Sequence, residues 1–398
     1  MVQIPLISGI YGGSATDFER SVPVNLTPIA EPGDGSGTGV SKGFLKTVPG
    51  IVTEHTASGA DRGAVVYDGQ HLRVIGSTLY LVGVTLTAIG YVGDDARPVQ
   101  FAEGFGRIAI CSNESMYYYD GSTLVQVTDP DLGRSYSITW SDGYFLSTDG
   151  DSIVVTELND PMSIDPLKYG SSEADPDPIV GLMAIRGEIY AINRYSIEKL
   201  INAGTTGFPF QRSRGAQIPK GCVGSAAYAA FVETFAFCGS ARNESPSIYL
   251  AGAGQAIRIS PRALDDAMAS LSREELPTIE LETLNASGLY QLYVHLPRET
   301  WVYHWTASQL LDMPVWSKLA GGVMTDQPWP GRHYQRVGVE WYCGNAGKIG
   351  RVDENATTIF DDKIGYRFDT PLIYNEGRGA IAHDAELTVR GTANVAMS

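Results

Sequence analysis

The stretch VQFAEGFGRIAICSNESMYYYDGSTLVQV, residues 99–127, decides the fold class of this 398-residue chain. Residues 107–111 are predicted to form a buried strand and residues 116–119 a second strand, because Ile, Val and Tyr suit a pleated, half-buried surface. The Asp-Gly pair that follows supplies the positive backbone angles that a tight hairpin needs. The stretch therefore predicts an antiparallel meander of three or four strands.

The same unit returns along the chain, each time as a Gly or acidic turn, an apolar strand, a polar turn and an aromatic-rich strand. Its turns are anchored at Asp68-Gly69, Gly106, Asp142-Gly143, Arg186-Gly187, Glu233, Gly288 and Glu340. Successive anchors lie 37, 37, 44, 46, 55 and 52 residues apart, and propeller blades repeat at about 40–50 residues. The sequence therefore predicts an all-β chain folded as a β-propeller of about seven blades. Six blades stay open because the later copies are degenerate, and a pair of β-sandwiches is the alternative fold.

The chain divides into an N-terminal arm and loop (1–63), the propeller (64–353) and a C-terminal β segment (354–398). The arm contains a run rich in Gly, Pro, Ser and acidic residues at 30–39, which cannot bury enough apolar surface to fold alone. We expect an exposed loop there. The arm could dock on a neighbour or supply the strand that closes a propeller ring, and the sequence does not choose between them.

One amphipathic helix is predicted as an insertion on the propeller. Apolar residues recur at helical spacing at Ala263, Leu264, Ala267, Met268 and Leu271. Ser260 is the expected N-cap, with Pro261 at the first helical position. The apolar stripe is expected to pack against the core.

Composition bounds the function. The chain carries 45 acidic and 29 basic residues, a net charge of −16, which disfavours wrapping of nucleic acid but not its passage. The first residues lack a signal-peptide pattern and no later run is long enough to span a bilayer, so we expect a soluble chain. The four Cys are far apart and are predicted to be reduced core residues.

No motif for catalysis, a cofactor or a metal is found, and none of these is expected. The chain has no G-x-S-x-G and no P-loop, and its six His residues are dispersed. His295 lies in an apolar strand, where a core or interface role is the ordinary one. The acidic turns at 129–131 and 149–151 are predicted to be solvated rather than calcium sites. A carboxylate pair for glycoside cleavage stays open, because its members need only be close in space.

Two segments are candidate interfaces. The first is the acidic loop around Asp34. The second is a predicted loop that contains Trp329, Arg332, Tyr334 and Arg336, since Trp, Tyr and Arg are common interface anchors. The alternative is that these side chains cover a blade edge.

Landmarks along nearly the whole chain are similar to those of one family. They are Pro23-Val24-Asn25, GFLKTVPGI at 43–51, Arg62-Gly63, Lys220-Gly221-Cys222, the strand pair within 247–256 with the following helix and Glu274-Glu275, YVHLP at 293–297 with Val302-Tyr303, and Thr370-Pro371-Leu372. In this order they resemble the packaged-DNA stabilisation, or tail hub, proteins of short-tailed bacteriophages. The stretches 31–39 and 329–336 depart from the family pattern.

The resemblance implies a structural virion protein without catalytic activity or a cofactor. It implies a ring of six copies below the portal and its adaptor, which retains packaged DNA and anchors the tail needle and the tailspikes or fibres. DNA would pass through its channel without sequence-specific binding. Assembly would take place in the host cytoplasm and the product would lie in the virion tail. Family members tend to continue beyond the equivalent of Ser398, so a shorter relative or a missing end is expected.

Two other functions stay open. The first is a propeller glycosidase or depolymerase that acts on bacterial surface polysaccharide, and the second is a carbohydrate-binding propeller. A mass measurement separates both from a hub, which should form a ring. From the net charge we also expect that the channel surface of an assembled ring is acidic or neutral, so that DNA slides through it.

Overall fold

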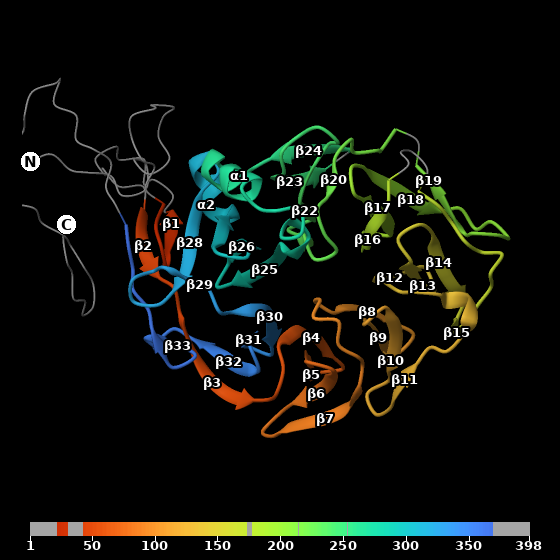
Figure 1. Ribbon diagram of the computed structural model, residues 1–398, viewed down its shortest axis with the longest axis horizontal. Helices are drawn as coiled ribbons and strands as arrows, with labels where there is room; N and C mark the ends of the chain where they lie inside the picture. Colours follow the sequence, from red (N-terminus) through yellow and green to blue (C-terminus); the bar gives the residue numbers. More distant parts are fainter. Residues whose placement is uncertain (1–21, 31–42, 173–176, 214, 253, 369–398) are drawn as a thin grey trace, which may run out of the picture.

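The computed structural model describes residues 22–30, 43–172, 177–213, 215–252 and 254–368. Within them the chain folds into seven sheets of mainly antiparallel strands arranged around a common axis (Figure 1). The prediction of a seven-bladed β-propeller is therefore confirmed. The loop around Asp34, the landmark at residues 370–372 and the C-terminal segment from residue 369 lie outside the described residues.

The first four blades follow one another along the chain, and each is a four-stranded meander. Blade 1 contains β4 (Asp61–Tyr67), β5 (Gln70–Ile75), β6 (Thr78–Val82) and β7 (Leu86–Tyr91). Blade 2 contains β8 (Gln100–Gly104), β9 (Arg107–Ser112), β10 (Ser115–Tyr119) and β11 (Leu124–Gln126). After the 3-10 turn η1 (Pro130–Leu132), blade 3 contains β12 (Ser137–Ser141), β13 (Tyr144–Thr148), β14 (Ile153–Glu157) and β15 (Asp160–Ile164). Blade 4 contains β16 (Ile179–Ile185), β17 (Glu188–Asn193), β18 (Ile197–Asn202) and β19 (Phe210–Arg212).

The last three blades are larger. Blade 5 contains β20 (Gly221–Cys222), β21 (Tyr228–Phe231), β22 (Thr234–Ser240), β23 (Ser247–Gly252) and β24 (Gln255–Arg258). Blade 6 follows the 3-10 turn η2 (Leu276–Thr278) and contains β25 (Glu280–Ala286), β26 (Leu289–His295), β27 (Thr300–His304), β28 (Trp316–Gly321) and β29 (Gln327–Pro328). Blade 7 contains β30 (Arg332–Val337), β31 (Glu340–Asn345), β32 (Lys348–Asp353), β3 (Gly50–Thr56), β33 (Thr358–Ile359) and β34 (Asp362–Lys363), in that order.

The seven repeat anchors fall at or beside the turn between the first two full strands of each blade. Several of these turns place two successive residues at positive φ, as Asp68 and Gly69 (46° and 72°) and Asp142 and Gly143 (50° and 88°) show. That conformation matches the right-handed twist of the flanking strands, and Gly adopts it without steric cost. The periodicity in the sequence therefore records one hairpin per blade.

The ring is closed by a strand from the N-terminal part of the chain. β3 pairs antiparallel with β32, with Gly50 opposite Asp353, and becomes the fourth strand of blade 7 (Figure 1). Of the two roles left open for the arm, this strand takes the ring-closing one. A Cβ on Gly350 would lie 2.3 Å from Ile51 Cγ2, so a glycine in β32 lets the closing strand pack closely.

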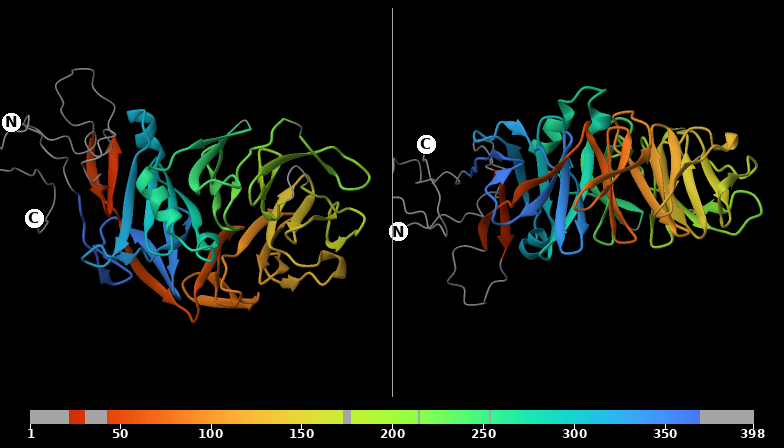
Figure 2. Two further views of the ribbon diagram at one scale, coloured as in Figure 1. Left: turned by 45° about the horizontal axis from the view of Figure 1, so that its top comes forward. Right: turned by 90° about the horizontal axis from the view of Figure 1, so that it is seen from below.

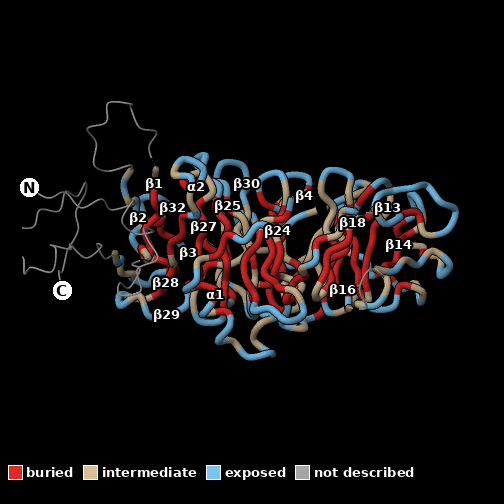
Figure 3. The backbone as a smooth tube through the Cα atoms, turned by 90° about the horizontal axis from the view of Figure 1, so that it is seen from above, coloured by how far each residue is buried: buried red, intermediate tan, exposed pale blue. Residues whose placement is uncertain are grey.

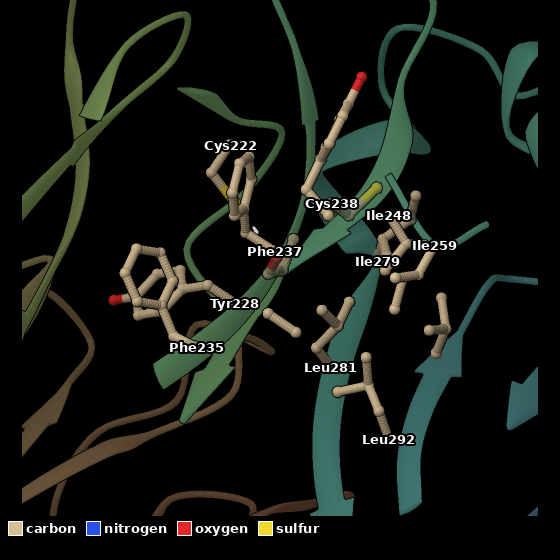
Figure 4. Packing of buried hydrophobic residues seen from close by; sticks show 14 of the residues in the cluster. Cys222, Tyr228, Phe235, Phe237, Cys238, Ile248, Ile259, Ile279, Leu281 and Leu292 are labelled. Atoms are coloured by element: carbon tan, nitrogen blue, oxygen red, sulfur yellow. Dashed lines mark hydrogen bonds between the residues drawn. The ribbon is translucent and has the colours of Figure 1, made fainter. Parts of the chain in front are cut away.

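The core lies between neighbouring blades, and the exposed residues lie at the turns on both faces (Figure 3). The largest buried cluster joins blades 4, 5 and 6: the Phe235 ring of β22 packs against Tyr190 of blade 4, and Leu281 and Leu292 of blade 6 lie on the other side of β22 (Figure 4). Buried apolar clusters join each blade to the next from blade 1 round to blade 7, so burial of apolar surface stabilises these junctions.

The predicted inserted helix is present as α1 (Arg262–Ala269), and it buries Leu264 and Met268 against blade 5. The prediction that Ser260 is the N-cap of this helix was wrong by one residue, since the N-cap is Pro261, whose backbone is extended. The Ser260 hydroxyl does not cap the helix but donates to Asp265 Oδ1 at 2.5 Å and accepts from the Ile248 N–H at 3.1 Å. A second helix, α2 (Trp305–Leu311), was not predicted, because its seven residues follow an aromatic-rich strand without a turn signal.

A two-stranded hairpin of β1 (Leu26–Ala30) and β2 (Gly43–Thr47) stands beside blade 6 outside the ring (Figures 1 and 2). Asn25 attaches it to that blade. Its side-chain amide donates to Ala320 O at 2.8 Å and Gly365 O at 2.7 Å, and its Oδ1 accepts from the Ala320 N–H at 2.9 Å. Asn25 is fully buried and has a φ of 58°, and its hydrogen bonds with Ala320 are buried while the one to Gly365 O is partly buried.

Candidate functional site: the axial cavity and the closing seam

A cavity of about 370 Å³ lies where the innermost strands of blades 2 to 7 converge. Its apolar wall comes from β8, β12, β16 and β25 and includes Val99, Phe101, Ile138, Leu182, Met183 and Leu281. Its polar wall consists of Gln100, Thr139, Ser225, Tyr228, Glu280, Glu282 and His333. We consider this cavity and the charged groups behind it the candidate site.

A hydrogen-bonded network around Gln100 joins four blades at the cavity wall. The Ser137 hydroxyl donates to Gln100 Oε1 at 2.6 Å, and the Gln100 amide donates to Ser225 O at 2.8 Å and to the Tyr228 hydroxyl at 3.1 Å. The Leu182 N–H donates to Ser137 Oγ at 2.9 Å. Since every partner belongs to the protein itself, this part of the wall holds the blades in register.

Two carboxylates on one face of β25 line the other side of the cavity. Glu282 Oε1 lies 3.1 Å from His295 Nε2, and its Oε2 accepts the Tyr334 N–H at 2.9 Å. Burial opposes ionisation of Glu282, but these contacts outweigh it and hold its pKa well below the usual range. Burial raises the pKa of Glu280, against the opposing charges of His333 and Arg332. The two carboxyl groups therefore have pKa values displaced in opposite directions.

A buried charged contact crosses the seam between blades 1 and 7, directly behind the cavity. Arg73 Nη1 donates to Asp61 Oδ2 at 2.7 Å, and Arg73 Nη2 donates to His333 O at 2.9 Å. His333 Nδ1 lies 2.5 Å from Asp61 Oδ1. The side chains of Arg73 and Asp61 are 0% and 1% exposed. A Cβ on Gly344 would lie 2.1 Å from Asp61 Cγ, so the absence of a side chain there makes room for the pair.

The predicted interface residues at 329–336 lie at the edge of this site rather than in a free loop. Trp329 is buried and its indole N–H donates to the Tyr334 hydroxyl at 2.9 Å, while Tyr334 meets the Tyr293 ring edge-on. Arg332 donates to Trp329 O at 2.9 Å, and Arg336 is exposed and donates to Gly338 O at 3.0 Å.

The expectation of a loop from 329 to 336 was wrong from residue 332 onward, because this part forms β30, the innermost strand of blade 7. An interface role for these residues stays a prediction, in which Arg336 is the exposed member. The sequence analysis missed Asp61, Arg73, Glu280 and Glu282. A signal was present, since Arg73 interrupts the apolar run of β5 and the two Glu alternate with apolar residues on β25.

Metal and thiol chemistry have little support at this site. Among the residues that the structure describes, no group of three or more His, Cys, Asp or Glu side chains could hold a metal ion. The four Cys are buried and unpaired, and burial raises the pKa of Cys111 and Cys222 to about 12. Across the described part of the chain, no helix is long and apolar enough to cross a membrane.

The fold and the site define a closed β-propeller with a hydrogen-bonded polar network and a cluster of charged groups at its axis. The family model described as "Bacteriophage P22 Gp10, beta-propeller" matches residues 2–357, and the chain belongs to this family. The tail hub protein gp10 of Salmonella phage P22 is 27% identical over 392 residues, which cover 93% of this chain and 80% of gp10. The resemblance seen in the sequence is thus confirmed, and it supports a structural protein of a phage tail.

Two solved structures are similar to the chain at very low identity. The extracellular domain of a two component system from B. thetaiotaomicron is 8% identical, with a TM-score of 0.50, over 78% of this chain and 40% of that chain. The Pan2 WD40 domain of Neurospora crassa is 11% identical, with a TM-score of 0.46, over 79% of this chain and 97% of that domain. The first of these likenesses shows the propeller fold alone.

Proposed function

We propose that this chain is the hub of a short phage tail. In this proposal six copies form a ring below the portal and its adaptor, retain the packaged DNA, anchor the needle and the tailspikes or fibres, and conduct DNA during ejection. The observation that carries the proposal is the family match, which reaches from residue 2 to residue 357 and includes strands of all seven blades. The tail hub name of the P22 relative supports the same role.

The architecture suits a load-bearing part of an assembly. The ring is closed by β3, its blades share buried faces, and the polar network around Gln100 is satisfied within the chain. Such a scaffold can present many loops in fixed positions while its core stays unchanged. A cyclic ring of copies would form by contacts between unlike faces of neighbouring molecules.

The charge of the chain supports passage of DNA without binding. With a net charge of −16, the assembled channel is proposed to be acidic or neutral, so that phosphates are not held by Lys or Arg. A structure of the assembled ring tests this directly. A channel wall covered with Arg and Lys would contradict the proposal.

The test of the hub role is assembly with tail components. Native mass spectrometry and electron microscopy of the chain, alone and with portal and adaptor proteins, should show a ring with six times the 42.8 kDa chain mass, at least on the portal complex. A chain that stays a monomer both alone and in the presence of these proteins would contradict the role. The isolated propeller should keep its fold in either case, which separates failure to assemble from failure to fold.

A second function is favoured by one observation, the opposite pKa displacements of Glu280 and Glu282 at the axial cavity. Such a pair is how glycosidases separate a general acid from a second carboxylate. We still expect no cleavage of host surface polysaccharide, because Glu282 contacts His295 and the Tyr334 N–H, and Glu280 lies near His333.

An assay of reducing-end release checks this expectation. Release that disappears in Glu280→Gln and in Glu282→Gln, but persists in the exposed-site variant Glu233→Gln, would establish the hydrolase instead. Release that persists in all three variants would point to a contaminating enzyme and leave the expectation intact.

A further inference from the structure

His333 lies at the junction between blades 7 and 1, where the closing strand β3 of blade 7 leads into β4 of blade 1. β30 of blade 7 lies beside β4 of blade 1, and the blade 7 sheet contains both the late strands β30 to β32 and the early strand β3. His333 occupies an irregular part of β30, between Arg332 and Gln335, at a φ of 51°. This conformation turns its ring toward Asp61 of blade 1, 2.5 Å away, and Glu280 of blade 6, 3.8 Å away.

The negative and positive charges of the groups around His333 balance only when the His333 ring itself is protonated. The neighbours come from every packed element: Asp61 on β4, Arg73 on β5, Glu280 and Glu282 on β25, His295 on β26, Arg332 on β30 itself and Cys343 on β31. These neighbours include three carboxylates and two guanidinium groups, so a protonated His333 supplies the third positive charge. Loss of the His333 proton leaves the buried cluster with an excess of negative charge, which a buried environment tolerates poorly.

We infer that His333 is a pH-dependent latch on the closing seam, whose imidazolium joins the seventh blade to Asp61 of the first and Glu280 of the sixth. When the ring loses its proton, the junction weakens and the inner edge of the seam opens more often. This inference concerns the integrity of a single propeller. It goes beyond the proposed hub role and does not depend on it.

The direction of the pH effect follows from the contacts. Burial acts to lower the pKa of His333, but the hydrogen bond and charge of Asp61, with Glu280 and Glu282, outweigh it and raise the pKa above the ordinary value. A native pKa above the unfolded one gives a stabilising contribution that is fully present below about pH 6.5 and is lost as pH rises through the native pKa.

The neighbouring groups act in other pH ranges. Burial, with the nearby Arg332 charge, lowers the pKa of His295 to about 4, so this residue stays neutral in the fold from pH 6.5 upward. The lowered pKa of Glu282 stabilises the fold, and this contribution is lost only under acidic conditions, as the carboxylate becomes protonated. Burial raises the pKa of the Cys343 thiol, so the folded chain keeps that proton in the alkaline range. His333 is the base of the cluster whose contacts raise its pKa, so it loses its charge at a higher pH than an ordinary His.

Hydrogen–deuterium exchange of the intact chain tests the latch. Amides of β4 and β30 should exchange at least about threefold faster at about pH 9 than at about pH 6.5, after division by the intrinsic pH dependence of exchange. Amides of β13, in blade 3, should show no such increase. Equal corrected rates at the seam in the two conditions would overturn the inference without any variant.

Two substitutions assign the effect to His333. In His333→Gln, which cannot titrate, the seam should exchange fast at both pH values and lose its pH response. In His55→Gln, which changes a histidine on β3 whose Nε2 lies 3.0 Å from Gly83 O, the wild-type response should remain. A seam in His333→Gln that keeps the full wild-type response would assign the pH effect to another group and refute the latch.

Discussion

Replacing Asp61 with Asn should destabilise the propeller by about 3–5 kcal/mol, the cost of leaving a buried charge without its partner. Asp61 accepts from Arg73 Nη1 at 2.7 Å and lies 2.5 Å from His333 Nδ1, and both charged groups are shielded from solvent. Asn preserves the shape of the side chain but removes its charge, so that the fully buried Arg73 keeps only the carbonyl oxygen of His333 and a weaker acceptor. Chemical denaturation, with a fitted free energy of unfolding, measures the loss.

A matched ion pair on the surface is the control for this variant. Lys46 and Glu354 lie 3.0 Å apart with side chains 47% and 63% exposed, and Glu354→Gln should change stability by less than about 1 kcal/mol. If both variants lost the same small amount, the seam would be held by apolar packing alone. The buried charges would then have no measurable role in closing the ring.

Replacing Asn25 with Ala should cost about 3–5 kcal/mol, or release the hairpin β1–β2 from blade 6. Three hydrogen bonds disappear, and the N–H and C=O of Ala320 and the carbonyl of Gly365 lose partners in a buried or half-buried region, at about 1–3 kcal/mol for each group that stays unsatisfied. The positive φ of 58° adds about 1 kcal/mol, because Ala adopts that region less readily than Asn.

Thermal unfolding measures the first outcome, and limited proteolysis between β2 and β3 measures the second. Asn159→Ala is the control, since Asn159 has a φ of 59° but an exposed side chain, and it isolates the backbone cost of about 1 kcal/mol. An Asn25 variant no less stable than the Asn159 variant, and no more sensitive to protease than the wild type, would show that the hairpin is held elsewhere.

The fold was predictable because its repeat depends on local backbone chemistry. Asp68-Gly69, Asp142-Gly143 and Arg186-Gly187 all take two positive φ values at the first hairpin of a blade, and such turns are visible in a single sequence. The number of blades then followed from the number of apolar strand pairs around these turns. Even in the degenerate later copies, the anchors at Glu233, Gly288 and Glu340 lie at or beside the corresponding turns.

The site was much less predictable, because its members come together only when the ring closes. Asp61 and His333 are far apart in the chain, and no periodicity links them. Trp329 and Tyr334 show a different difficulty: aromatic residues beside Arg are typical of interface anchors, but they are equally typical of a core with one polar edge. Burial of Trp329 in the cluster between blades 6 and 7 could be established only from the packing.

The closing strand β3 also has a consequence for biosynthesis. Ribosomes make Gly50 long before Asp353, so the closing strand of the seventh blade must wait for most of the polypeptide before its antiparallel hydrogen-bonding partner exists. A nascent chain that stalls before that point exposes an unpaired strand edge and remains a target for chaperones and proteases. Products that terminate before β32 therefore lack the antiparallel partner of β3 and cannot close the ring in this way.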